Sequence, residues 1–132
     1  GGGSVNPPTH ETIDQGLHNF YQDGRSVFKY AVTSMADVAA EIMERNNLKG
    51  DDIAYLVPHQ ANKRIIDATA NRMGVGMDRV VVTVPDHGNT SAASIPLALS
   101  VGVERGQIKQ GQVIVTEAIG GGLAWGSVVI RW

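Results

Sequence analysis

Three short segments of the sequence carry groups that could stabilise a negative charge developing on an oxygen atom. His59 lies in the segment VPHQAN (residues 57–62), Asn89 lies in HGNTS (residues 87–91), and Gly121 is the middle residue of three consecutive glycines. A histidine ring, a side-chain amide and backbone N–H groups are the donors that form oxyanion holes. The sequence contains no cysteine, and its serines lie in no recognisable nucleophile motif. We therefore expect the chain to supply half of an active site.

His59 has both a structural and a catalytic interpretation. A single histidine after a strand is more often a structural hydrogen-bonding residue than a catalyst, and its position alone favours that interpretation. Two features favour catalysis. Active groups of α/β proteins gather at the carboxyl ends of strands, where His59 is expected, and Pro58 restricts the backbone just before it.

Asn89 and the glycine run also allow two interpretations each. Asparagine is common in turns and at helix caps, and a glycine run is typical of a hairpin turn that needs positive φ. The functional interpretation is that a neutral amide beside a neutral histidine stabilises an enolate oxygen without protonating it early. The glycines would let a backbone N–H approach the ligand closely.

Basic residues are few but partly clustered on the segment that follows His59. Lys63, Arg64 and Arg72 fall on one predicted helix. A solvent-exposed helix face explains this spacing, and so does a contact surface for a phosphate group or an acidic partner. His10 and the acidic residues after it match no metal-site template, so we predict no metal site.

Hydrophobic periodicity indicates one α/β domain. Apolar residues recur at helical spacing in several segments, and short apolar or β-branched runs between them indicate strands. Residues 1–12 are predicted to be an irregular lead-in or linker, and residues 13–132 to be the domain. Alternating helices and strands favour an α/β sandwich with a partly parallel sheet and a final antiparallel hairpin. The predicted helices are 24–47, 62–73 and 94–105, and the predicted strands are 53–57, 80–84, 113–118 and 124–132.

Composition excludes several classes of protein. A formal net charge of −2 argues against general nucleic-acid binding, and no apolar run approaches the roughly 18 residues needed to cross a bilayer. Hydrophobic residues at 42% and charged residues at 18% are typical of an ordinary soluble globular protein. The first four residues, GGGS, carry no secretory signal and could be a linker remnant or a native loop. The absence of cysteine is compatible with the cytoplasm.

The segments VPHQAN, GNTSAAS and EAIGGGLAWGS together resemble the carboxyl-terminal half of β-ketoacyl-acyl-carrier-protein synthase III. The resemblance runs from about Val5 to Trp132. It implies a thiolase-type fold, in which two similar α/β halves pack as αβαβα layers, usually in a homodimer. It also implies a cytoplasmic acyltransferase of fatty-acid synthesis that needs no cofactor. The expected partners are an amino-terminal half bearing the cysteine nucleophile, an acyl-CoA primer and malonyl-acyl-carrier protein.

The resemblance also implies a role for each matching residue. His59 and Asn89 would bind the malonyl thioester oxygen during decarboxylation, and the N–H of Gly121 would serve the acyl-cysteine step. Ile119 stands where the family commonly has phenylalanine, which predicts a different primer size or cysteine environment, and Gln22 stands where methionine is frequent. The predicted coenzyme A contacts are Gly24, Arg25, Asn62 and Arg64, and the predicted carrier-protein contacts are Lys29, Lys63, Arg64 and Arg72.

Three hypotheses remain open at this stage. The first is half of a condensing enzyme that is inactive alone because the nucleophilic cysteine is absent. The second is a non-catalytic domain that binds acyl-CoA or a carrier protein. The third is half of a related thiolase-fold acyltransferase with different chemistry, for which Ile119 is the one indication.

Overall fold

The computed structural model describes residues 2–132, and its longest element is the helix α2 (Gly24–Arg45). The carboxylate of Asp23 caps this helix by accepting hydrogen bonds from the N–H groups of Arg25 and Ser26. The hydrogen bond from the Ser26 hydroxyl, together with these backbone bonds, lowers the pKa of Asp23. The helix ends two residues before the predicted end. Its buried face consists of Ala31, Met35, Ala36, Ala39 and Met43.

A three-stranded mixed sheet lies beside this helix, in the order β1-β2-β3. β1 (Tyr55–Pro58) pairs in parallel with β2 (Val113–Gly120), and β2 pairs antiparallel with β3 (Ala124–Arg131). The last pair of the hairpin is Gly120 with Ala124, so a three-residue turn joins the strands. This arrangement confirms the predicted α/β fold with a partly parallel sheet and a final hairpin.

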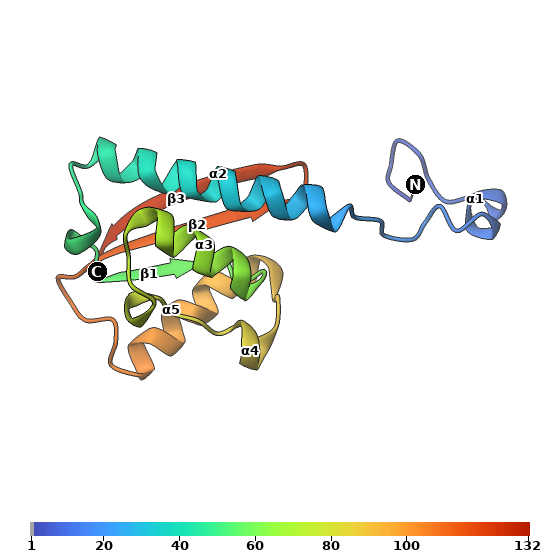
Figure 1. The fold of residues 1–132 in the computed structure, drawn as a ribbon. Coiled ribbons are helices and arrows are strands. Elements are labelled where there is room, and N and C mark those ends of the chain that lie inside the picture. Colours follow the sequence, from blue (N-terminus) through green and yellow to red (C-terminus); the bar gives the residue numbers. More distant parts are fainter. Residues whose placement is uncertain (1) are drawn as a thin grey trace.

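Helices cover both faces of the sheet (Figure 1). α2 and α3 (Lys63–Met73) pack on one face around Val115, and α5 (Ser94–Glu104) packs on the other around Ile114. Neighbouring residues of β2 therefore enter opposite cores, as the period of a strand requires. The predicted cap of α3 is confirmed, because Gly74 adopts the left-handed conformation there (φ 67°).

α5 is apolar on nearly all sides but buried on only one. Its buried residues are Ser94, Ala98 and Gly102, which recur every four positions. These small residues bring the helix close to the core: a Cβ added to Gly102 would lie 2.7 Å from Cδ1 of Ile108. On the outer side, Val103 is 42% exposed, and Ile95, Leu97, Leu99 and Val101 are only half-buried. Apolar side chains of this helix therefore remain partly uncovered in the described chain.

The predicted strand over residues 80–84 is wrong. Val80 forms a single parallel bridge with Leu56, and the N–H of Val81 donates to the carbonyl of Leu56 at 3.0 Å. The chain then turns into the short helix α4 (Val84–His87). The physical reason is that from the carbonyl of Val81 onward the side chain of Gln60, rather than a neighbouring strand, bonds the backbone of this segment.

Residues 2–23 contain no buried residue. They carry the short helix α1 (His10–Asp14) away from the sheet and its helices (Figure 1), and Phe20 and Gln22 at their end line a pocket beside the sheet. The sequence analysis did not predict α1, which a capping box between Thr9 and Thr12 stabilises. The predicted division into residues 1–12 and 13–132 stays a prediction, and Gly1 lies outside the described residues. Single 3₁₀ turns cover Gly50–Asp52, Met77–Arg79 and Ser91–Ala93.

Among residues 2–132, no helix is both long enough and apolar enough to cross a bilayer.

Candidate active site

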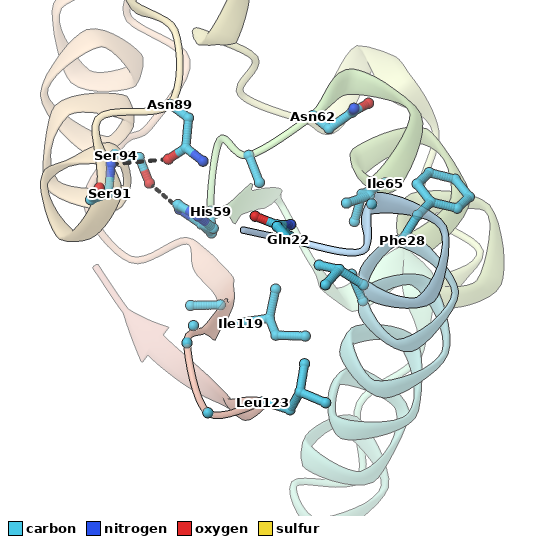
Figure 2. A pocket seen from close by; sticks show the side chains of 18 of the residues that line it. Gln22, Phe28, His59, Asn62, Ile65, Asn89, Ser91, Ser94, Ile119 and Leu123 are labelled. Carbon is cyan, nitrogen blue, oxygen red and sulfur yellow. Dashed lines mark hydrogen bonds between the residues drawn. The ribbon is translucent and has the colours of Figure 1, made fainter. Parts of the chain in front are cut away.

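One open pocket of about 1310 Å³ collects the predicted catalytic residues (Figure 2). His59 comes from the end of β1, Asn89 from the loop after α4, and Gly121 from the turn between β2 and β3. The pocket thus lies at the carboxyl end of β1 and of the parallel neighbour β2, where α/β proteins bind their ligands. The other predicted residues that line it are Gly24, Arg25, Asn62, Arg64 and Ile119.

His59 is held from two directions. Its backbone N–H donates to the carbonyl of Glu117 at 2.7 Å, which extends the pairing of β1 with β2 by one residue. Its ring atom Nδ1 lies 2.5 Å from Oγ of Ser94 in α5. Burial lowers the pKa of His59, so its ring is neutral at pH 7.

Gln60, the residue after His59, is fully buried and was missed by the sequence analysis. Its amide nitrogen donates to the carbonyls of Pro58 (2.9 Å) and Val81 (3.0 Å), and its amide oxygen accepts from the N–H groups of Thr83 (2.8 Å) and Val84 (3.1 Å). The side chain therefore ties the loop that carries His59 to the segment that leads toward Asn89. Glutamine is usually exposed, and no local pattern marks this one as buried.

Asn89 is oriented by a turn of its own loop. Its Oδ1 accepts the N–H of Ser91 at 3.0 Å, which is the turn interaction expected of asparagine. Because the oxygen is engaged, the amide nitrogen remains as the free end, and it points toward the pocket in Figure 2. The structural interpretation of Asn89 is therefore correct for its oxygen and leaves its N–H groups available for a ligand.

The pairing of Gly120 with Ala124 closes the glycine turn. Gly122 has φ 80° and Leu123 has φ 54°, so the turn does need the positive φ that the hairpin interpretation predicted. Gly120 and Gly121 do not adopt positive φ, and a Cβ at either would meet nothing within 4 Å. The turn thus presents bare backbone to the pocket.

The residues predicted to bind coenzyme A lie at two helix N-termini. Gly24 and Arg25 begin α2, and Asn62 caps α3 by accepting the N–H of Arg64 at 2.9 Å. The Arg64 guanidinium lies 4.8 Å from the centre of the Phe28 ring, in a cation–π contact that joins the two helices. An anion at this rim would meet two guanidinium groups, those of Arg25 and Arg64.

The predicted carrier-protein contacts divide into two groups. Lys63 forms an ion pair with Asp67 (2.8 Å) and Arg72 forms one with Asp37 of α2. Lys29 and Arg64 have no such ion pair among residues 2–132: Lys29 lines a separate pocket beside Trp125, and Arg64 stacks on Phe28. The charges of Lys63 and Arg72 are therefore partly neutralised within the chain.

Glu117 is a second titratable group close to the site that the sequence analysis missed. Its side chain is almost fully buried, and this burial raises the pKa of Glu117 to about 8, an effect that the Thr69 hydroxyl only partly offsets. The carboxyl is therefore mainly protonated at pH 7. Among residues 2–132, no group of three or more His, Asp or Glu side chains could hold a metal ion.

Residues 43–132 match the family model described as 3-oxoacyl-[acyl-carrier-protein (ACP)] synthase III C terminal. The whole chain is 56% identical over 132 residues to the β-ketoacyl-[acyl-carrier-protein] synthase III of Chlorobium luteolum, covering 40% of that protein. It is 66% identical over 109 residues to the enzyme of the same name from Cereibacter sphaeroides, matching 83% of this chain and 34% of the relative. The chain therefore spans about two fifths of the length of the relatives it matches.

The fold agrees with this similarity. The crystal structure of 3-oxoacyl-[acyl-carrier-protein] synthase III from Aquifex aeolicus superposes with a TM-score of 0.85 at 41% identity, covering 88% of this chain and 38% of that one. The thiolase-type fold predicted from the sequence is thereby confirmed, and its match is again confined to part of the larger protein.

Proposed function

This chain belongs to the 3-oxoacyl-[acyl-carrier-protein] synthase III family and forms its C-terminal part, and we propose that the complete protein is an acyltransferase that condenses an acyl-CoA primer with malonyl-acyl-carrier protein. The reaction would be the initiating condensation of fatty-acid synthesis. The printed sequence holds no cysteine, so the nucleophile that carries the primer would come from a different segment.

The observation that supports this proposal best is the placement of His59 and Asn89 in the same pocket. Each has one polar atom engaged on the protein side: Nδ1 of His59 by Ser94, and Oδ1 of Asn89 by Ser91. Their remaining nitrogen atoms, Nε2 and Nδ2, are then the groups available to a ligand in the pocket that both residues line. Two neutral N–H donors that meet in a pocket suit a developing oxyanion.

The proposed chemistry uses these donors in the decarboxylation step. When the bond from malonyl carbon to carboxylate breaks, carbon dioxide leaves and the electron pair forms an enolate on the thioester. His59 and Asn89 stabilise the enolate oxygen, and a neutral histidine does not transfer a proton to it early. The enolate carbon then attacks the acyl-cysteine carbonyl and expels the thiolate, while the N–H of Gly121 stabilises the oxyanion of that step.

Substrate binding follows from the charges and contacts at the pocket rim. Arg25 and Arg64 would bind the phosphates of coenzyme A, with Gly24 and Asn62 beside them, and Ile119 would limit the primer inside the pocket. For the acidic carrier protein we expect Lys29 and Arg64 to contribute more than Lys63 and Arg72, which already have carboxylate partners. The proposed reaction requires no cofactor beyond these thioester substrates.

The uncovered surface of α5 supports an amino-terminal half as partner. The length of the relatives leaves room for that half, and an apolar helix with one buried face normally packs against a second layer. We propose that the complete protein is a cytoplasmic homodimer. We also expect the 132-residue chain alone to show no condensation, and turnover by a preparation proven to contain only this chain would contradict that expectation.

The test of the function separates its two half-reactions in the complete enzyme. His59→Ala and Asn89→Ala should each slow malonyl decarboxylation by about 10²- to 10³-fold, the usual effect of removing one oxyanion donor. Acylation of the cysteine should change much less. His87→Ala is the matched control, because His87 is an exposed histidine that does not line the pocket. Equal loss of both half-reactions would contradict the assigned roles.

A further inference from the structure

We propose that the Ser94 hydroxyl is a positioning residue that holds His59 in the tautomer with its proton on Nε2. This inference rests on the proposed function for its catalytic meaning, and on hydrogen-bond geometry alone for the tautomer. Ser94 belongs to none of the predicted sites, and the sequence gives no reason to connect it with a residue 35 positions away.

Two contacts define the environment of the hydroxyl. Ser94 is the first residue of α5 and is 1% exposed. Its Oγ lies 2.5 Å from Nδ1 of His59 and accepts the backbone N–H of Gln60 at 3.2 Å. The same oxygen thus contacts two successive residues of the loop after β1, and Figure 2 shows its bond to the histidine ring.

Counting protons decides which partner donates to the other. A serine hydroxyl has one proton to donate, and its oxygen can accept. The N–H of Gln60 can only donate, so it uses the oxygen as an acceptor. The serine proton must then find an acceptor of its own, because a buried donor without a partner is costly. Nδ1 of His59 is that acceptor only when it carries no proton.

The neutral ring therefore carries its proton on Nε2. Burial already favours the neutral ring over the charged one, and the hydroxyl then selects between the two neutral forms. With its proton on Nε2, the ring donates a hydrogen bond to a ligand in the pocket. With its proton on Nδ1, the ring would present a lone pair to the enolate oxygen, which would repel the developing charge.

The hydroxyl keeps this direction because both elements around it are fixed. Gln60 cannot move its N–H away, since its own side chain makes four hydrogen bonds to neighbouring backbone groups. α5 cannot rotate easily, since Ala98 and Gly102 pack the same helix face tightly against the core. Ser94 therefore acts on catalysis through His59, without contact with the reacting atoms.

The direct test measures the tautomer in the full 132-residue chain by ¹⁵N NMR of labelled histidine side chains. His59→Gln identifies the His59 signals among those of the four histidines. We expect wild-type His59 to be neutral with its proton on Nε2, and Ser94→Ala to populate the Nδ1-protonated form. Ser100→Ala, on the exposed side of the same helix, should leave the wild-type pattern. A wild-type ring protonated on Nδ1 would overturn the proposal without any variant.

Kinetics of the complete enzyme provide the second readout. Ser94→Ala should slow decarboxylation roughly ten-fold, as expected for one lost hydrogen bond, and leave cysteine acylation unchanged. A purely structural role of Ser94 would lower both rates with the amount of folded enzyme, and that result would count against the proposal. If His59→Ala retains full decarboxylation while the tautomer is as expected, the proposed function fails and the tautomer assignment stands.

Discussion

The two sides of the pocket are built in opposite ways. On the side of His59 and Asn89, the Ser94 hydroxyl bonds the ring of His59 and also accepts the backbone N–H of Gln60, and the backbone N–H of Ser91 donates to Asn89. On the side of the glycine turn, residues 120–126 are all exposed and no side chain contacts a Cβ position at the three glycines. The difference indicates that hydrogen bonds within this chain hold the donor side, whereas the turn lacks comparable side-chain contacts among residues 2–132.

The largest expected effect on stability comes from Gln60, which anchors the side of the pocket that carries His59 and Asn89. Gln60→Ala removes four hydrogen bonds and leaves buried backbone groups without partners. Each such group costs about 1–3 kcal/mol, so we expect the free energy of unfolding to fall by at least about 3 kcal/mol in urea denaturation. Gln15→Ala, an exposed glutamine on the lead-in, is the matched control. Equal stability of the two variants would show that the side of the pocket that carries His59 and Asn89 does not depend on Gln60.

A smaller effect, on the pH dependence of stability, is expected at Glu117, whose backbone carbonyl accepts the N–H of His59. Its pKa is raised from 4.5 to about 8, so the folded chain binds more protons than the unfolded chain in this range. The contribution of Glu117 to the free energy of unfolding is therefore fully present below pH 4.5. It falls as the pH rises toward 8, on the order of 1 kcal/mol per pH unit. Glu117→Gln should remove this decline.

The measurement is urea denaturation of both proteins between pH 6.5 and 8. The lowered pKa of His59 acts in the opposite direction, because the unfolded ring binds more protons, and this contribution fades as the pH rises above its ordinary value of 6.5. It is the same in wild type and Glu117→Gln, so the difference between the two proteins reports Glu117. If wild type and Glu117→Gln change in parallel with pH, Glu117 is ionised in the folded chain and the assignment is wrong.

The smallest effects are expected in the glycine turn. Gly122→Ala forces a side chain into positive φ and should cost about 1 kcal/mol. Gly121→Ala has no such strain and open space for its Cβ, so its unfolding free energy should stay within about 0.5 kcal/mol of wild type. Urea denaturation of the isolated chain measures both. A large loss of stability from Gly121→Ala would show that the glycine turn is already packed within this chain. The two sides of the pocket would then not differ in the way described.

The parts of the fold that follow local patterns were predictable. Helical periodicity placed α2, α3 and α5 within two residues of their observed ends, and Gly74 marked the C-cap of α3. Each of these signals lies within a few positions of the feature it predicts. The β-branched run at residues 80–84 predicts a strand that the fold does not contain. Only Val80 and Val81 contact β1, and the rest of the run bonds one buried side chain, Gln60, from a segment more than twenty residues earlier. No pattern within the run indicates this.

The candidate site shows the same division. His59, Asn89 and the glycines could be predicted because strand ends and turn residues are visible in the sequence, and the structure places them around one pocket. Ser94 could not, because its contact with His59 exists only after α5 packs beneath β1. The ion pair of Arg72 with Asp37 was missed for the same reason, since it joins two helices that meet only in the folded chain. The catalytic and binding roles themselves stay predictions.

The buried carboxyl of Glu117 has a consequence for the solution around the protein. In the unfolded chain at pH 7 this group has lost its proton, whereas in the folded chain it mainly retains one. Folding therefore takes up a proton, and the folded chain is close to one unit less negative than its formal net charge of −2. In a weakly buffered solution, refolding of the chain would leave the surrounding water slightly more alkaline.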